Sequence, residues 1–199
     1  MRPNSPRIAP LPPENWDPET AERLRGSLSA PDGGTLNLFS TLARHPKLLK
    51  RWLVFASHLL VKGELPARER ELLILRTAWN CGCEYEWGQH VLLARSAGLT
   101  ESEIVRVVEG PQARGWSAPD AALLRAADEL RTSSRIASGT WSALREFLTE
   151  QQLIELPFVV GQYHLVAFTL RSLEVAREPG VPGWPDAHTP PTATPGDDA

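Results

Sequence analysis

Residues 66–90 read PARERELLILRTAWNCGCEYEWGQH, and this stretch determines the fold expected for the chain. Its first half, around ELLILRTAW, has apolar residues on nearly every side of a helix, which is typical of a helix buried in a bundle. Pro66 suits the first turn of that helix, where a missing N–H is tolerated. A second helix starts near Glu84 and ends before Gly98, because glycine takes the left-handed cap conformation cheaply.

The rest of the chain also has helical patterns, and strand alternation is hard to find. Thr100 with Glu103, and Thr149 with Gln152, match the capping-box spacing at two helix starts. A second apolar segment, LIELPFVVGQYHLVAFTL, predicts another buried helix, kinked or split at Pro157. The predicted fold is an all-α bundle with two buried central helices. Helices are expected at about 18–28, 46–61, 67–81, 84–97, 101–109, 118–132, 140–148 and 150–174.

Length and composition indicate one domain with ordinary globular character. The chain has 199 residues, and its 18 prolines gather near both ends. We expect a Pro-rich arm over 1–15, a helical domain over 16–177 and a Pro-rich flexible tail over 178–199. Trp16 and Trp184 are the aromatic residues in these regions that are expected to dock on the body or on a neighbouring subunit.

The charge balance bears on the partners. The formal net charge is −3 and no long Lys/Arg run is present, which argues against nucleic-acid binding. The N-terminus lacks the apolar core of a signal peptide. We expect no membrane-spanning helix, because no apolar stretch reaches the roughly 18 residues needed to cross a bilayer. We therefore predict a cytoplasmic protein with no membrane partner, acting on small molecules or assembling with other subunits.

Polar side chains gather on and before the helix that starts near Glu84. Cys83, Glu86, Trp87 and His90 are three or four residues apart, so they share one side of it. Glu71 lies on the helix expected to be most buried, where a carboxylate is costly unless it is paired. More ordinary explanations also exist. Glu86 and His90 can form a surface pair, Glu71 can pair with Arg68 or Arg76, and Cys81 and Cys83 can be inert buried thiols.

The sequence from Leu65 to Ile104 resembles the carboxymuconolactone decarboxylase family in its alkylhydroperoxidase D-like branch, and the likeness extends over about residues 35 to 175. The thiol-peroxidase members of that branch have a glutamate, eleven residues, and then Cys-x-x-Cys-x-x-x-His with a proton-relay residue between the cysteines. On this chain these positions are Glu71, Cys83, Tyr85 and His90. Glu86 occupies the position of the second cysteine.

This departure favours acid–base chemistry over thiol chemistry, as in the decarboxylase-like members, which use no metal or organic cofactor. His90 is the natural proton carrier. Glu71 or Glu86 would fix its tautomer, and Tyr85 would donate to a carbonyl or enolate oxygen. Arg76 would pair with a carboxylate of the substrate or of the protein. Arg76, Trp87 and His164 are thus the candidate substrate-binding residues, beside the catalytic candidates His90, Glu71, Glu86, Tyr85 and Cys83.

Three functions follow from these residues and from the resemblance. The first is a cofactor-independent decarboxylase or isomerase acting on a small lactone or related carboxylate, with no metal ligands assigned. The second is an alkylhydroperoxidase-like or peroxiredoxin-like thiol enzyme that uses Cys83 with Cys81 and needs a low thiolate pKa. The third is a non-catalytic, oligomeric ligand-binding or stress protein. The resemblance also implies a homo-oligomer, either a trimer, a hexamer or a dimer.

Overall fold

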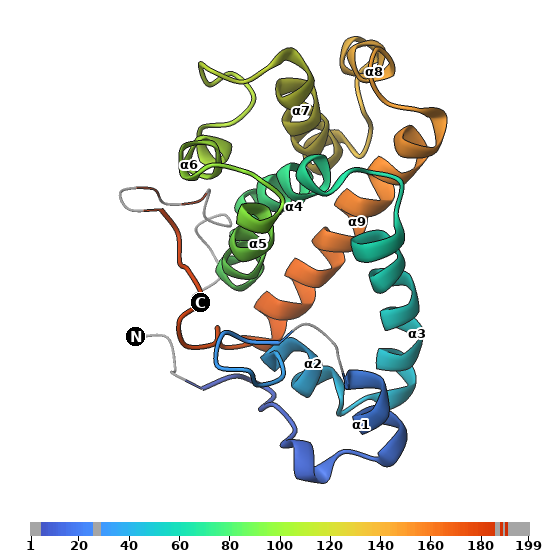
Figure 1. Cartoon of the computed structure of the whole chain (residues 1–199), viewed down its shortest axis with the longest axis vertical. Coiled ribbons are helices and arrows are strands. Elements are labelled where there is room, and N and C mark those ends of the chain that lie inside the picture. The colour runs from blue at the N-terminus through green and yellow to red at the C-terminus, as the bar shows by residue number, and fades with distance from the viewer. Residues whose placement is uncertain (1–4, 26–28, 186–187, 189, 191–199) are drawn as a thin grey trace.

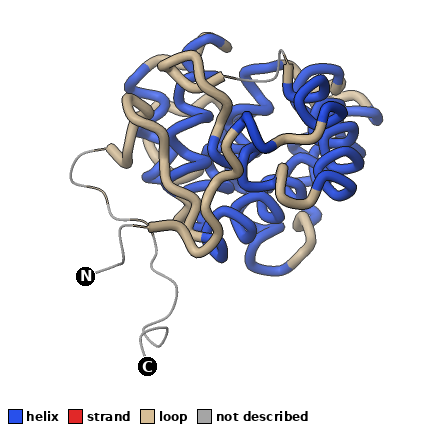
Figure 2. The backbone as a smooth tube through the Cα atoms, turned by 90° about the horizontal axis from the view of Figure 1, so that it is seen from below, coloured by secondary structure: helices blue, strands red, loops and turns tan. Residues whose placement is uncertain are grey.

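The computed structural model describes residues 5–25, 29–185, 188 and 190, and this part of the chain is an all-helical bundle without a named strand (Figures 1 and 2). The all-α prediction is therefore confirmed. The α-helices are α1 (Pro18–Leu24), α2 (Asn37–Leu42), α3 (Pro46–Ser57), α4 (Ala67–Cys81), α5 (Glu84–Ser96), α6 (Glu101–Glu109), α7 (Ala118–Ser133), α8 (Ser138–Arg145) and α9 (Glu150–Leu173), with a 3-10 turn at Pro13–Asn15 and a π-helical turn, η2, at His58–Lys62.

Helices α4 and α9 form the centre of the bundle, as the sequence predicts (Figure 1). Helix α4 packs against α5, α7 and α9, and its four residues Leu72 to Leu75 are fully buried. Buried residues of α9 recur at helical spacing, at Val159, Tyr163 and Val166. These contacts make the core that fixes the position of α5.

Helices α4 to α7 agree with the predicted bounds to within one residue, whereas α1 ends at Leu24 and not near residue 28, and α8 spans Ser138–Arg145 and not 140–148. Three other helices also differ from the prediction. Helix α2 was not predicted, because its six residues are too few for a periodic signal. Helix α3 ends at Ser57, and the chain continues as the π-helical turn η2. Helix α9 passes through Pro157 as one continuous helix, so the predicted split is wrong. Both predicted capping boxes, at Thr100 and at Thr149, are present.

A sharp corner joins α4 to α5 at the Cys81-Gly82-Cys83 segment. Gly82 has a φ of +59°, in the left-handed region that favours glycine. The backbone N–H of Cys83 donates to the carbonyl oxygen of Ala78 at 2.9 Å, which closes the end of α4. Cys83 is then the N-cap of α5. The two cysteines thus stand at the corner that sets the direction of α5.

Residues after α9 lie against the body of the protein. A β-carbon at Gly88 of α5 would lie 2.2 Å from the carbonyl oxygen of Pro182 and 2.6 Å from Val181. Trp184 packs edge-on against Trp79 with a ring separation of 5.2 Å. The segment Ala176–Trp184, called the C-terminal strap below, therefore rests on α5. The division of the chain into arm, domain and tail stays a prediction.

Helix α9 is, by length and composition alone, apolar enough to cross a membrane, which the sequence analysis did not anticipate. Of its most apolar window, 56% is buried inside the bundle. That burial is typical of the core helix of a globular protein. The cytoplasmic location stays a prediction.

Candidate functional site

A cavity of about 320 Å³ lies among α2, α3, α5 and α9. This volume is at the lower end of the range of about 300–1,000 Å³ found for ligand pockets, so the cavity suits a small molecule. Most of its wall is apolar, and the polar side chains are few. Its polar or aromatic lining residues include Phe39, Trp52, Ser57, Tyr85, Glu86, Gln89, His90, Gln162 and Tyr163.

His90 and Glu71 form a hydrogen-bonded pair at this cavity. His90 lines the wall, and its Nδ1 lies 2.7 Å from Oε2 of Glu71, which is fully buried on α4. An ionised carboxylate only accepts hydrogen bonds, so it holds the proton on Nδ1 and leaves Nε2 as the basic nitrogen. The ring of Tyr163 packs edge-on against that of His90 at 4.8 Å. The pair has the arrangement of a histidine base with a supporting carboxylate.

Among the residues that the structure describes, Glu71 has one further polar partner, and it is neither of those considered from the sequence. The Nε of Arg70 lies 3.3 Å from Oε1 of Glu71. Arg68 instead pairs with Glu103 and Asp120 on other helices. The simple ion pair of Glu71 with Arg68 or Arg76 is therefore absent.

Glu86 lines the cavity from the first turn of α5 and is only 2% exposed. Neither of its carboxyl oxygens has a hydrogen-bond partner among the described residues. Burial raises the pKa of Glu86 well above its usual value, because the ionised form loses its hydration. Burial thus favours the protonated form of Glu86, which can donate a proton or a hydrogen bond. It is not a surface partner of His90.

Tyr85 also lines the cavity, but its hydroxyl is already engaged. The hydroxyl donates to Oε1 of Glu178 at 2.6 Å and accepts from the backbone N–H of Leu38 at 3.1 Å. The other oxygen of Glu178 accepts from the amide of Gln89 at 2.6 Å. Burial and the neighbouring Glu178 raise the pKa of Tyr85. The arrangement favours a structural role for Tyr85 over the predicted donation to a substrate oxygen.

Glu178 belongs to the C-terminal strap and connects it to the cavity wall. This carboxylate is 6% exposed and also accepts from the backbone N–H of Asn37 at 2.6 Å. It therefore holds together the strap, the start of α2 and two cavity residues of α5. No signal in the sequence marks this residue, because it stands among prolines and glycines without a periodic pattern.

The two thiols are free, buried and outside the cavity lining. A helix N-terminus lowers the pKa of a thiol, and Cys83 is the N-cap of α5. Burial outweighs this effect and raises the pKa of Cys83. Burial likewise raises the pKa of Cys81 to about 11, although Arg131 donates to its sulfur at 3.4 Å. Neither thiol has the character of an activated nucleophile.

The three predicted substrate-binding residues do not line the cavity. Arg76 makes a two-pronged ion pair with Asp128, with contacts of 2.6 and 2.9 Å, which is the protein-carboxylate role considered for it. Trp87 packs in the core against Trp79. The Nδ1 of His164 is hydrogen-bonded to the carbonyl oxygen of Val160 at 2.8 Å, as in an ordinary helical histidine.

The residues of α9 that do reach the cavity are the neighbours of His164. Gln162 and Tyr163 line it, together with Val166 and Leu170. Successive residues of a helix point about 100° apart, so a shift of one position moves a side chain to another face. Tyr163, Val166 and Leu170 are at helical spacing, but the apolar residues on the other sides of α9 hide this face in the sequence.

No three His, Cys, Asp or Glu side chains within the described ranges are grouped so as to hold a metal ion. Glu71, Glu86 and His90 therefore do not make a ligand cluster. The chemistry that these residues can perform is proton transfer by a carboxylate-supported imidazole, with the carboxyl group of Glu86 in the same cavity.

Residues 46–129 match the model of the carboxymuconolactone decarboxylase family. This match includes Glu71, Cys83, Glu86 and His90, and it confirms the resemblance that these residues carry. No curated protein matches the chain.

Solved structures show the same fold. An alkylhydroperoxidase D core structure, an uncharacterized peroxidase-related protein from Ralstonia eutropha JMP134, has a TM-score of 0.78 at 18% identity, covering 90% of this chain and 95% of that chain. An uncharacterized peroxidase-related protein from Silicibacter sp. TM1040 has a TM-score of 0.75 at 17% identity, and the match covers 91% of this chain and 96% of that chain. The debrominase Bmp8 has a TM-score of 0.72 at 15% identity, and the match covers 86% of this chain and 92% of that chain. At such identities the likeness shows the fold alone.

Proposed function

We propose that this chain, whose residues 46–129 match the carboxymuconolactone decarboxylase family and whose fold is the alkylhydroperoxidase D-like one, is an acid–base enzyme. It moves a proton between carbon atoms of a small lactone or related carbonyl compound. Decarboxylation with a double-bond shift and simple isomerisation, the two reactions implied by the resemblance, both need this transfer. The observation that carries the proposal is the 2.7 Å pair of His90 and Glu71 in a cavity that also contains the buried, unpartnered carboxyl group of Glu86.

The proton transfer runs in two steps. In the first, Nε2 of His90 removes a proton from a carbon next to the substrate carbonyl, and the electron pair of the broken C–H bond forms an enol or enolate. Glu86 donates its hydrogen bond to the carbonyl oxygen as negative charge develops there. In the second step the imidazolium of His90 returns the proton to another carbon. Glu71 stabilises that imidazolium, as a buried carboxylate does behind a catalytic histidine.

Thiol chemistry is the alternative, because solved relatives are described as peroxidase-related. It needs an accessible thiolate, since the thiolate is the nucleophile. Cys83 is 1% exposed and its pKa is raised, as described above. These observations support the acid–base proposal over the thiol alternative.

The proposal is tested with a β,γ-unsaturated butenolide in deuterated water. The wild-type protein is expected to exchange the carbon-bound hydrogen next to the carbonyl and to shift the double bond. His90→Gln should reduce both rates by about 10²–10⁴, the usual contribution of a positioned base. Equal rates for wild type and His90→Gln would contradict the proposal.

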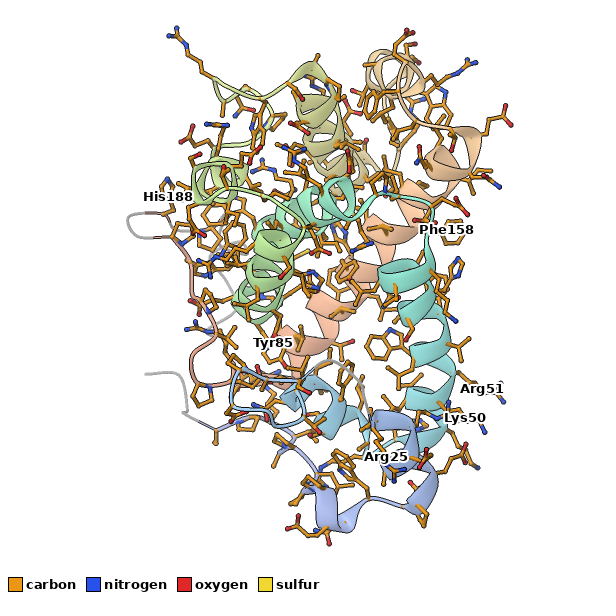
Figure 3. The ribbon with its side chains drawn as sticks, in the orientation of Figure 1. Arg25, Lys50, Arg51, Tyr85, Phe158 and His188 are labelled. Carbon is orange, nitrogen blue, oxygen red and sulfur yellow. The ribbon has the colours of Figure 1, made fainter. Side chains whose placement is uncertain are left out.

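We also propose that the protein is a homo-oligomer, in which a second copy covers an apolar face formed by α3 and α9. Phe158 and Phe168 are 55% and 59% exposed on α9, and Figure 3 shows Phe158 at the edge of the bundle. Residues 156–170 contain no Asp, Glu, Lys or Arg, whereas a helix face exposed to water normally has charged side chains. Large exposed apolar patches mark contact sites. The other exposed apolar residues of this face are Val54, Phe55, Ile154 and Leu165.

A further inference from the structure

The charged groups around the cavity restrict what it can bind. Its described lining residues include no lysine and no arginine, and the ionisable ones are Glu86, His90 and two tyrosines, Tyr85 and Tyr163. Arg76, the arginine considered for binding a substrate carboxylate, is held by Asp128. The lining therefore offers an anion no permanent positive charge.

Three carboxyl groups lie in or next to the wall that α5 forms in this cavity. Glu86 is in the wall, Glu71 lies behind His90, and Glu178 lies behind Tyr85. Arg70 contacts Glu71 and lies outside the lining. A carboxylate that entered would lose its hydration and would meet these groups without a matching cation, which is costly in a buried site.

Two buried polar groups of the cavity residues lack partners among the described residues. One is the carboxyl group of Glu86, and the other is the indole Nε1–H of Trp52 on α3. Nearly all buried polar groups in proteins are hydrogen-bonded, so unpartnered ones at a cavity indicate a bound ligand or water. The indole is a donor only, and protonated Glu86 offers an O–H. Both groups require an acceptor.

We propose that the cavity binds an uncharged small molecule with a carbonyl-type acceptor, held by Trp52 and Glu86, and excludes the corresponding free carboxylate. The inference rests on the proposed function for the role of this cavity and deepens it by naming the substrate class. With no carboxylate to lose, the reaction is isomerisation: the proton removed from one carbon by His90 returns to another, and no carbon dioxide leaves. Trp52 is thus a specificity-determining residue.

The test measures binding by titration calorimetry to one butenolide ring in three matched forms, which carry a methyl ester, a free carboxylate or an aminomethyl group. The methyl ester is expected to bind at least about ten times more tightly than the carboxylate, which pays for its desolvation. Equal or tighter binding of the carboxylate or of the ammonium form would overturn the inference, and so would failure of all three to bind. Because binding is measured without turnover, an ester that binds but exchanges no proton refutes the proposed function alone.

A pair of variants tests the role of Trp52. Trp52→Phe keeps the aromatic ring and removes the N–H, so the affinity for the ester should fall by about two- to ten-fold, as for one lost hydrogen bond. The matched control is Trp141→Phe, because Trp141 is 40% exposed on α8 and does not line the cavity. If both variants bind the ester as tightly as the wild type does, Trp52 does not determine specificity.

Discussion

Replacing Glu71 by glutamine tests the supporting carboxylate of the proposed base. Glu71 is fully buried, and its Oε2 is 2.7 Å from Nδ1 of His90. A carboxylate accepts from that nitrogen, whereas an amide can offer its own N–H to it. In Glu71→Gln the imidazole is then free to place its proton on Nε2, the nitrogen that must be unprotonated to act as a base.

The expected magnitude follows from this geometry. The charge-assisted hydrogen bond is worth about 1.5–3 kcal/mol, and it holds both the tautomer and the orientation of the ring. Losing the correct tautomer of a supported histidine lowers kcat by up to about 10⁴. Glu71 does not line the cavity, so KM should change little. The assay is the exchange rate of the butenolide hydrogen with solvent deuterium.

Glu155→Gln is the control for buried-carboxylate effects. Glu155 is 8% exposed and accepts from the backbone N–H groups of Glu64 and Leu65 at 2.7 and 3.1 Å. It does not line the cavity. This variant should unfold at a lower temperature and keep its exchange rate. A Glu71→Gln protein that is folded and exchanges within about three-fold of the wild type would refute the reasoning.

Four further predictions address other parts of the molecule. Cys83→Ser should retain most of the exchange activity, and both wild-type thiols should react slowly with iodoacetamide at neutral pH; rapid labelling would favour thiol chemistry. Since burial raises the pKa of Glu86, the folded state holds the proton of this carboxyl more tightly than the unfolded state does. The free energy of unfolding should therefore fall as the pH rises above about 4.5, by at most about 1.4 kcal/mol per pH unit. Urea denaturation of Glu86→Gln should lack this fall, and identical pH profiles for variant and wild type would count against a protonated Glu86. Glu178→Gln should raise KM more than it lowers kcat, because the new amide N–H group would face hydrogen-bond donors such as the Tyr85 hydroxyl, from which the carboxylate accepts. Unchanged kinetics would show that the strap does not position the cavity wall. Phe168→Asp should dissociate the oligomer in analytical ultracentrifugation, whereas the control Phe147→Asp, at an exposed site outside α3 and α9, should not. An unchanged sedimentation coefficient of the Phe168→Asp protein would place the interface elsewhere.

The central part of the fold could be predicted from the sequence because local signals and burial agree there. The apolar run Leu72 to Leu75 of α4, the capping boxes at Thr100 and Thr149, and the glycine after α5 all indicated their elements correctly. The pairing of Glu71 with His90 was also among the predicted arrangements, because a carboxylate on a buried helix needs a partner.

Other parts depend on contacts distant in sequence. Glu178 reaches Tyr85 across 93 residues, and no local pattern marks it. His164 was taken for a cavity residue although Tyr163 occupies that face, since a segment apolar on all sides does not show which side faces the cavity. Arg76 finds Asp128 only through the packing of α4 on α7.

Solvent exchange of the butenolide hydrogen, followed by NMR in parallel for wild type, His90→Gln and Cys83→Ser, tests the central claim most directly. The account predicts exchange in the wild type and in Cys83→Ser, and a loss of about 10²–10⁴ in His90→Gln. Exchange that persists in His90→Gln and disappears in Cys83→Ser would contradict it.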